Sequence, residues 1–97
     1  MQVMIRWRLK PDEVDRELEL LRAVYEELAS VQPDDLRYAT FQLEDNVTFV
    51  SFVDLAAGPE LLHQLKAFQR YRRSLDDRCD EPPVMTLMQE LGAYRFH

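Results

Sequence analysis

The strongest constraint on the fold is the alternation of side chains along residues 3–9. Every second residue there is apolar, and the residues between them include two arginines. Because successive side chains of a β-strand point to opposite faces, this period of two predicts a strand with one buried face. The expected buried set is Val3, Ile5, Trp7 and Leu9, opposite Met4, Arg6 and Arg8. A second layer must cover that apolar face.

A helix is expected directly after this strand, over about residues 11–31. Pro11 followed by two acids is typical of a helix start, because proline fits the first turn and carboxylates meet the positive end of the helix dipole. Apolar residues then recur at spacings of four and three, the period of a helix with one apolar face. These residues are Val14, Leu18, Leu21, Tyr25 and Leu28. The turn-forming residues 32–35 end the segment.

Two strands joined by a tight turn are expected next. Residues 36–44 and 47–55 are rich in aromatic and β-branched side chains, which favour strands. The turn is placed at Glu44, Asp45 and Asn46, because aspartate and asparagine tolerate turn geometry. The second strand is apolar on both faces, so both faces of the sheet are expected to be covered there.

A second helix and a last strand complete the pattern. Gly58–Pro59 is expected to open the helix, which should fray near residue 78, where carboxylates oppose the dipole at a helix C-terminus. Pro82–Pro83 closes the segment, and residues 84–96 read as a strand with Gly92 at a bulge or bend. The apolar face of this helix is expected to carry Leu61, Leu65, Phe68, Leu75 and Cys79.

This order of elements predicts an α+β fold, a ferredoxin-like β-α-β-β-α-β sandwich with two helices on one face of a four-stranded antiparallel sheet. Ninety-seven residues suit a single domain, expected to span 1–97. The helices would leave the other face of the sheet bare. The expected residues of that bare face are Met4, Tyr38, Thr40, Val50, Phe52 and Met88, interleaved with Arg6, Arg8, Gln42 and Glu90.

A small soluble sheet does not normally expose so much apolar surface, so we expect a second copy of the chain to cover this face as a homodimer. Arg6 and Arg8 are expected to form ion pairs across the sheet, with Glu90 within reach if the first and last strands are neighbours. The predicted dimer-interface residues are Arg6, Arg8, Tyr38, Phe52 and Met88.

Composition and charge argue against several functional classes. The formal charge of −6 disfavours nucleic-acid binding, which depends on basic contacts to phosphate. Two glycines cannot build a glycine-rich phosphate loop, and the acidic cluster near residue 78 lacks the spacing of a calcium loop. A single cysteine, Cys79, suits a reducing cytoplasm, and the N-terminus lacks the apolar run of a signal peptide or membrane span. We therefore expect a cytoplasmic protein with no metal, nucleic-acid or membrane partner.

The chain resembles the dimeric α/β-barrel superfamily and, within it, the antibiotic-biosynthesis-monooxygenase-like (ABM-like) group. The resemblance follows the order of elements over nearly the whole chain and is best seen in residues 47–75, VTFVSFVDLAAGPELLHQLKAFQRYRRSL. A strand there ends in an aromatic and an acid, and a helix follows with an early histidine and an aromatic second half. Those features are Phe52, Asp54, His63, Phe68 and Tyr71. The resemblance implies sheet-to-sheet dimers with a small pocket between helices and sheet in each protomer.

Characterised members of this group include cofactor-free oxygenases of polycyclic aromatics and haem-degrading enzymes. They depend on an asparagine, on a tryptophan near the second helix and, in the haem group, on a histidine ligand. Here the only asparagine, Asn46, lies in the predicted turn, and the only tryptophan, Trp7, lies on the first strand. His63 falls near the helix start, where a haem ligand is not expected. The resemblance therefore implies the fold without the active site.

The candidate site residues are those that the pattern places near such a pocket. His63 is the candidate catalytic residue, because imidazole can act as a general base near neutral pH; the alternative is a histidine on the helix surface. Trp7, Phe68 and Tyr71 are candidate ligand-binding residues, and the alternative for each is packing in the core. No cofactor is expected.

Two functions are compatible with these residues. The first is a cofactor-free monooxygenase or isomerase acting on a small hydrophobic, aromatic compound. The second is a dimer without catalysis that binds a small ligand or another protein. The sequence alone does not choose between an enzyme and a binding protein.

Overall fold

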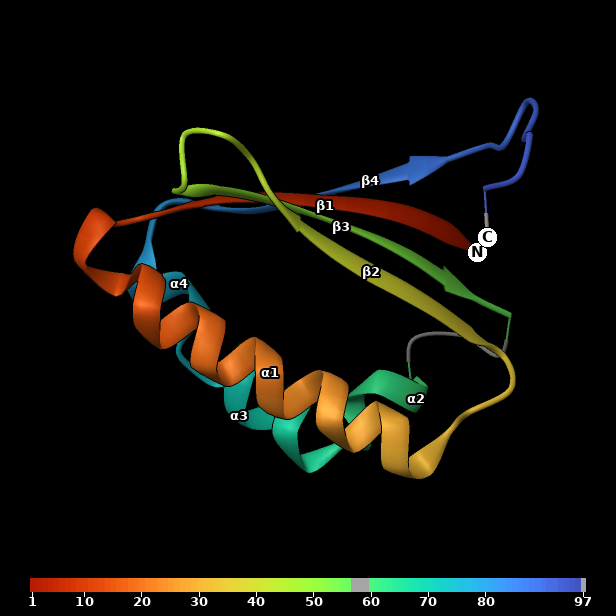
Figure 1. The fold of residues 1–97 in the computed structure, drawn as a ribbon, viewed down its shortest axis with the longest axis horizontal. Helices are drawn as coiled ribbons and strands as arrows, with labels where there is room; N and C mark the ends of the chain where they lie inside the picture. The colour runs from red at the N-terminus through yellow and green to blue at the C-terminus, as the bar shows by residue number, and fades with distance from the viewer. Residues whose placement is uncertain (57–59, 97) are drawn as a thin grey trace.

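The sheet is four-stranded and antiparallel, in the order β2-β3-β1-β4 (Figure 1). The computed structural model describes residues 1–56 and 60–96. The strands are β1 (Gln2–Leu9), β2 (Leu36–Gln42), β3 (Thr48–Leu55) and β4 (Cys79–Met88). The helices are η1 (Pro11–Glu13), α1 (Val14–Val31), α2 (Glu60–His63), α3 (Lys66–Arg73) and α4 (Leu75–Arg78). This is the expected ferredoxin-like arrangement.

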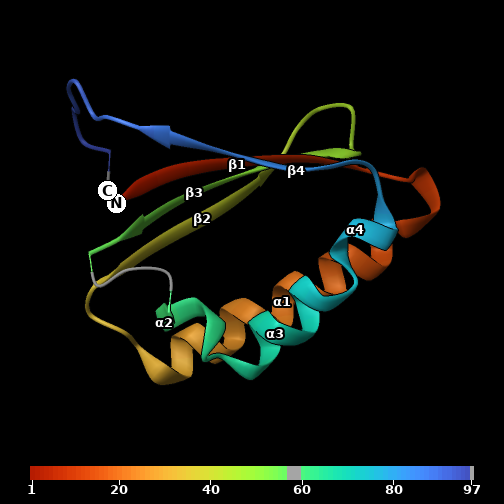
Figure 2. The ribbon, with the colours of Figure 1, turned by 180° about the vertical axis from the view of Figure 1, so that it is seen from behind.

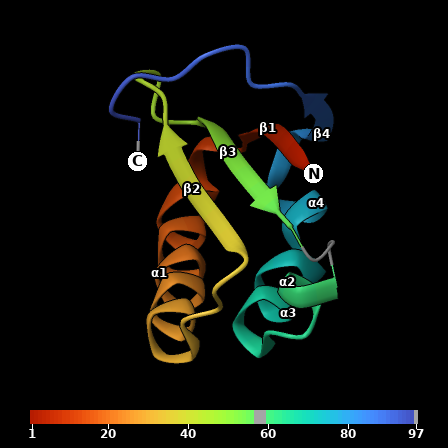
Figure 3. The ribbon, with the colours of Figure 1, turned by 90° about the vertical axis from the view of Figure 1, so that its right-hand side faces the viewer.

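All the helices lie in one layer against one face of the sheet. The view from behind shows α2, α3 and α4 following one another along that layer (Figure 2). Seen end-on, α1 and α3 run side by side beneath the strands (Figure 3). Buried apolar side chains from both layers form a single cluster between them, which includes Val3, Trp7, Val24, Phe49 and Phe68. In the described residues, no helix combines the length and apolar character needed to cross a membrane.

The second helical segment is broken into three pieces, although one helix was expected. Leu65, between α2 and α3, has an extended backbone, and Ser74 separates α3 from α4. From Leu62 to Tyr71 the buried residues recur every three positions, a spacing that drifts around a helix of 3.6 residues per turn, so the break at Leu65 returns the apolar side to the core. These residues are Leu62, Leu65, Phe68, Tyr71 and Leu75. The segment ends at Arg78, as predicted; the expected start at Gly58–Pro59 lies outside the described residues.

Helix α1 is rotated relative to the expected apolar face. Its buried residues are Glu17, Leu20, Leu21 and Val24. Leu18, expected in the core, is 39% exposed. The rotation has a chemical cause: buried polar partners hold the side chain of Glu17, and its position brings residues 20, 21 and 24 onto the sheet.

Tyr38 and Thr40 point toward the helices, not toward the bare face as expected. In the register of β2 with β3, Tyr38 lies opposite Val53 and Thr40 lies opposite Ser51, both of which are buried on the helix side. The predicted place of Tyr38 on the bare face is therefore wrong, and its part in a dimer interface stays a prediction. Both faces of β2 mix apolar and polar side chains, so alternation alone could not orient this strand.

Strand β4 begins earlier than expected and ends earlier. It spans Cys79–Met88 instead of 84–96, and it contains Pro82–Pro83, which were expected to precede the strand. Prolines are tolerated because β4 lies at the edge of the sheet next to β1, and the register between these two strands shifts near Arg8. Cys79 is thus the first residue of a strand instead of a helix residue. Residues 89–96, including Gly92, leave the sheet and cross its bare face (Figure 3).

Candidate functional site

A buried carboxylate lies at the centre of the helix–sheet core. Glu17 on α1 is fully buried, and its Oε2 accepts hydrogen bonds from Trp7 Nε1 at 3.0 Å and from the Tyr71 hydroxyl at 2.9 Å. Its Oε1 accepts from Arg78 Nε at 3.0 Å, which makes a buried ion pair. We call these four residues the Glu17 cluster. They come from β1, α1, α3 and α4, so the cluster joins both layers of the fold.

Arg78 is held by further contacts. Its Nη1 donates to Ser74 Oγ at 2.6 Å, its Nη2 donates to the backbone oxygen of Tyr71 at 3.0 Å, and its guanidinium lies 5.5 Å from the Tyr71 ring centroid. A buried ion pair must be matched by such bonds, because removing two charges from water costs several kcal/mol per ion. The Arg78 charge also balances that of Glu17, so the cluster is neutral as a whole.

The cluster keeps its phenol protonated. Burial raises the pKa of the Tyr71 hydroxyl above its ordinary value, and the neighbouring Glu17 carboxylate raises that pKa further. Tyr71 is therefore a hydrogen-bond donor and not a base. Burial also raises the pKa of the nearby Cys79 thiol to about 11, which leaves little thiolate near neutral pH.

A second polar group adjoins this cluster from β2 and β3. The Tyr25 hydroxyl and Thr40 Oγ1 are 2.7 Å apart, and Thr40 Oγ1 and Ser51 Oγ are also 2.7 Å apart. Burial raises the pKa of Tyr38, hydrogen bonds to Thr40 and Ser51 oppose that rise, and the charge of Glu17 adds to it. Tyr38 thus lies within electrostatic reach of the Glu17 cluster. Together the two groups form a polar seam through an otherwise apolar core.

A pocket of about 300 Å³ opens between the C-terminal half of α1 and β2, and we call it the α1–β2 pocket. The rings of Tyr25 and Tyr38 lie 5.2 Å apart at 32° to each other. The other residues along its wall are aliphatic or neutral. The lining consists of Tyr25, Leu28, Ala29, Gln32, Pro33, Leu36 and Tyr38.

The four predicted site residues fall along one line of contacts, but only part of that line is a polar site. Trp7 and Tyr71 meet on Glu17, and Trp7 also stacks on Phe49 at 5.8 Å. The ring centroids of Phe68 and Tyr71 lie 6.1 Å apart, and the Phe68 ring meets the His63 ring edge-on with 5.7 Å between centroids. His63 itself is exposed at the end of α2 and does not line the α1–β2 pocket.

Sequence reasoning missed Glu17 and Arg78. The signal for Glu17 was its spacing, since it precedes the buried Leu20 and Leu21 by three and four residues and Val24 by seven. An acid on the buried face of a helix must have a buried partner unless water reaches it. No sequence spacing identifies that partner as Arg78, which is 61 residues away. Among the described residues, no group of three or more histidine, cysteine, aspartate and glutamate side chains has an arrangement that could hold a metal ion.

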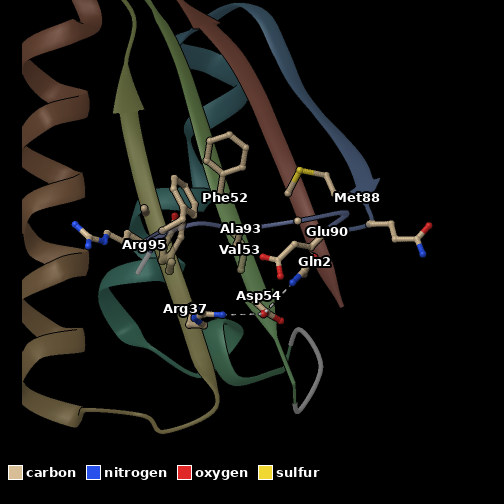
Figure 4. A pocket seen from close by; sticks show the side chains of 14 residues that line it. Gln2, Arg37, Phe52, Val53, Asp54, Met88, Glu90, Ala93 and Arg95 are labelled. Carbon is tan, nitrogen blue, oxygen red and sulfur yellow. Dashed lines mark hydrogen bonds and ion pairs between the residues drawn. The ribbon is translucent and has the colours of Figure 1, made fainter.

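A larger cleft of about 890 Å³ lies on the bare face, between the sheet and residues 89–96 (Figure 4). Phe52 and Met88 line its apolar part. At one end Asp54 accepts a hydrogen bond from Gln2 Nε2 at 3.3 Å and forms an ion pair with Arg37 at 3.8 Å, drawn as dashed lines in Figure 4. The predicted interface residues Phe52 and Met88 thus share one cleft.

Arg6 and Arg8 also lie on the bare face, as their alternation predicts. The first and last strands are neighbours, but the ion-pair partner of Arg8 is Glu81 at 3.9 Å, not Glu90. Because β1 and β4 are antiparallel and Gln2 pairs with Met88, Glu90 falls beyond the start of β1, at the opposite end from Arg8. Glu90 lines the cleft instead.

Comparison with protein-family models gave no match, and no curated protein matched at a significant level of sequence similarity. Several solved structures match in fold. A presumed antibiotic biosynthesis monooxygenase from Nitrosomonas europaea aligns with a TM-score of 0.74 and 18% identity, covering 93% of this chain and 88% of that chain. A Mycobacterium tuberculosis protein aligns with a TM-score of 0.74 and 20% identity, covering 95% of each chain.

A third match is a dimeric ferredoxin-like protein of unknown function from Jannaschia. It aligns with a TM-score of 0.67 and 13% identity, covering 92% of this chain and 97% of that chain. At such identities the likeness concerns the backbone and carries no site residue across. The chain has the ferredoxin-like fold that these proteins share, including the one described as an antibiotic biosynthesis monooxygenase.

Proposed function

We propose that the protein is an ABM-like homodimer that acts as a cofactor-free monooxygenase on a small aromatic compound. The fold matches a presumed monooxygenase of that group along almost its whole length. The observation that carries the proposal is the Glu17 cluster. Apolar side chains of similar volume would fill the same space without the cost of desolvating two charges, so the presence of a carboxylate, a phenol and a guanidinium there favours a chemical role.

Each member of the cluster has a distinct chemical capacity. Trp7, Tyr71 and Arg78 are hydrogen-bond donors, and Glu17 is the acceptor that they share. Glu17 is therefore the group that can take a proton from a substrate hydroxyl, and Tyr71 can donate a hydrogen bond to the oxygen that develops charge. The reaction is the oxidation of a phenol by O2, in which one oxygen atom enters the product quinone and the other leaves as water. The substrate supplies all four electrons.

The homodimer is supported by the bare face of the sheet. Phe41, Val84 and Met88 are 46%, 63% and 36% exposed there, and Phe52 meets Phe41 edge-on at 5.8 Å. This apolar surface extends into the cleft of about 890 Å³, and side chains of a second copy would fill that space. The dimeric ferredoxin-like protein from Jannaschia has the same fold.

A binding dimer without turnover is the second candidate, and one observation favours it. The donors of the Glu17 cluster already have partners within the protein, and Trp7, Tyr71 and Arg78 are at most 4% exposed. A substrate would reach Glu17 only after a neighbouring side chain moved. His63, the base expected from the sequence, lies on the surface.

The test combines native mass spectrometry with an oxygen electrode. We expect a dimer that consumes one O2 per molecule of an added phenol or naphthol and releases no hydrogen peroxide. Tyr71→Phe keeps the ring but removes the donor to Glu17, so we expect turnover to fall roughly 100-fold or more. Tyr94→Phe, at a phenol that is 82% exposed, is the matched control and should leave turnover unchanged.

The outcomes separate the candidates. A dimer that retains an aromatic compound but consumes no O2 would replace the monooxygenase with the binding dimer. Equal turnover in Tyr71→Phe and in the wild type would remove the Glu17 cluster from the reaction. A monomer at micromolar concentration would overturn the homodimer.

A further inference from the structure

We infer that the α1–β2 pocket binds a neutral aromatic compound with a single ring. That this compound is the substrate rests on the proposed function; that the pocket binds it does not. The resemblance to enzymes of polycyclic aromatics does not suggest this class. It follows from the volume, walls and charge of the pocket.

The volume limits the size of the ligand. The pocket measures about 300 Å³, at the small end of the range of roughly 300–1,000 Å³ typical of ligand sites. A cavity of about 150 Å³ is enough to hold benzene. One substituted ring therefore fits with room for its substituents, whereas three or four fused rings do not.

The walls select an aromatic ligand. Tyr25 and Tyr38 present two rings inclined at 32°, and an added ring can pack edge-to-face or offset against either one. The hydroxyl end of Tyr25 is directed at the sheet, because it bonds Thr40 on β2, so its ring forms the wall. Leu28, Leu36 and Pro33 supply the apolar contacts around these rings.

The charge of the lining selects a neutral ligand. None of the seven lining residues carries a formal charge. A carboxylate or ammonium group in the pocket would lose hydration without gaining an ionic partner, which is costly. A phenol, in contrast, keeps its one hydroxyl satisfied with a single neutral partner.

Gln32 is the neutral partner that the backbone places at this pocket. It closes α1 with a left-handed backbone, φ 51° and ψ 58°, and its N–H donates to the Leu28 oxygen at 2.8 Å. Glycine or asparagine is the usual residue at such a position, because a longer side chain strains a left-handed backbone. A glutamine at a strained position in the lining of a pocket points to a role of its amide group in binding the ligand.

Tyr38 connects this pocket to the candidate chemistry. It forms part of the pocket wall, and the charge of the Glu17 carboxylate contributes to the raised pKa of the Tyr38 hydroxyl. A ring bound against Tyr38 is thus adjacent to the polar seam of the core.

The experiment measures binding of three probes by calorimetry and ligand-observed NMR: phenol, benzoate and 1-hydroxypyrene. We expect one phenol site per subunit and much weaker binding of the other two probes. Ala29→Trp places a bulky ring at an exposed position that lines the pocket, so phenol affinity should fall at least about tenfold. Ser30→Trp, at the next exposed position and outside the lining, is the control and should stay within about twofold of wild type.

A second variant separates binding from stability. Gln32→Gly removes the amide and relieves the left-handed strain, so the thermal midpoint should hold or rise while phenol affinity falls roughly three- to tenfold. If neither Ala29→Trp nor Gln32→Gly weakens phenol binding, or if 1-hydroxypyrene or benzoate binds as well as phenol, the inference is overturned.

The inference and the proposed function fail in different ways. Oxygen consumption that Ala29→Trp leaves intact, while phenol binding is lost, would show that the ring bound in the α1–β2 pocket is not the substrate, and both the pocket assignment and the monooxygenase would stand. Phenol binding that Ala29→Trp abolishes, without any oxygen consumption by the wild type, would overturn the monooxygenase while the pocket assignment stands.

Discussion

At the scale of single residues, the unusual feature is a charged pair inside a small core. Glu17 and the Arg78 side chain are at most 5% exposed, and they stand 61 positions apart in the chain. The pair holds the start of β4 and the end of α4 to α1. Its removal should therefore cost more than the loss of one contact, because either partner alone is a buried charge.

We expect Glu17→Gln to lower the free energy of unfolding by about 3–5 kcal/mol, since it leaves the Arg78 guanidinium buried without its carboxylate. The double variant Glu17→Met with Arg78→Met should lose less free energy of unfolding than the sum of the losses in Glu17→Met alone and Arg78→Met alone. Urea unfolding at one fixed protein concentration measures both quantities. Additive losses would show that the pair is not energetically coupled in the folded protein.

At the scale of elements, the β2–β3 turn shows how one side chain orders a hairpin. Asp45 Oδ1 accepts from the backbone N–H groups of Val47 at 3.0 Å and Thr48 at 2.8 Å, and Oδ2 accepts from Thr48 Oγ1 at 2.6 Å. Asn46 supplies the left-handed residue, with φ 67°. The turn falls where the sequence predicts it, because aspartate and asparagine provide both the acceptors and the backbone freedom.

This turn carries a pH-dependent stability. The Thr48 hydroxyl, and then the backbone N–H groups, hold the pKa of Asp45 below its ordinary value of 3.8. The folded pKa is lowered, so the stabilisation is present above pH 3.8 and is lost as the pH falls through the folded pKa. Asp45→Ala should lower the thermal midpoint at neutral pH. The difference in thermal midpoint between this variant and the wild type should shrink as the pH falls through the folded pKa of Asp45. Asp34→Ala, at an exposed acid outside the β2–β3 turn, is the matched control and should leave the thermal midpoint at neutral pH close to that of wild type.

At the scale of the whole molecule, the two faces of the sheet have different environments. The helices cover one face, while residues 89–96 only cross the other, and Leu91, Tyr94 and Phe96 in that segment are 91%, 82% and 69% exposed. Both sides of β4 are also apolar and exposed, since Val84 on the bare face is 63% exposed, and Met85 and Leu87 on the opposite face are 65% and 70% exposed. Under the proposed homodimer, a second copy of the chain would cover this apolar surface.

Under the proposed homodimer, a charge on the bare face should separate the subunits. We expect Phe52→Asp to convert the dimer to monomer at micromolar concentration, because the new carboxylate would be desolvated without a partner. Leu18→Asp, on a 39% exposed leucine of α1, is the matched control and should remain dimeric. Light scattering coupled to size-exclusion chromatography distinguishes the two, and equal masses for both variants would place the interface elsewhere.

The amino-acid sequence by itself determined the order of strands and helical segments and the fold class. The period-two run at 3–9, the helical period after Pro11 and the turn at Asp45 and Asn46 are local patterns, and each predicts its element because the physics involved spans only a few residues. Their order then leaves few topologies, and the ferredoxin-like sheet is the one observed.

Tertiary structure alone decided which faces and partners these elements have. Tyr38 faces the helices because of its register with β3, and β4 keeps two prolines because it lies at an edge. The Glu17 cluster exists because α1, α3 and α4 bring a glutamate and an arginine together across 61 residues. Such contacts leave no local period in the sequence, since the energy that selects them arises only when distant segments exclude water together.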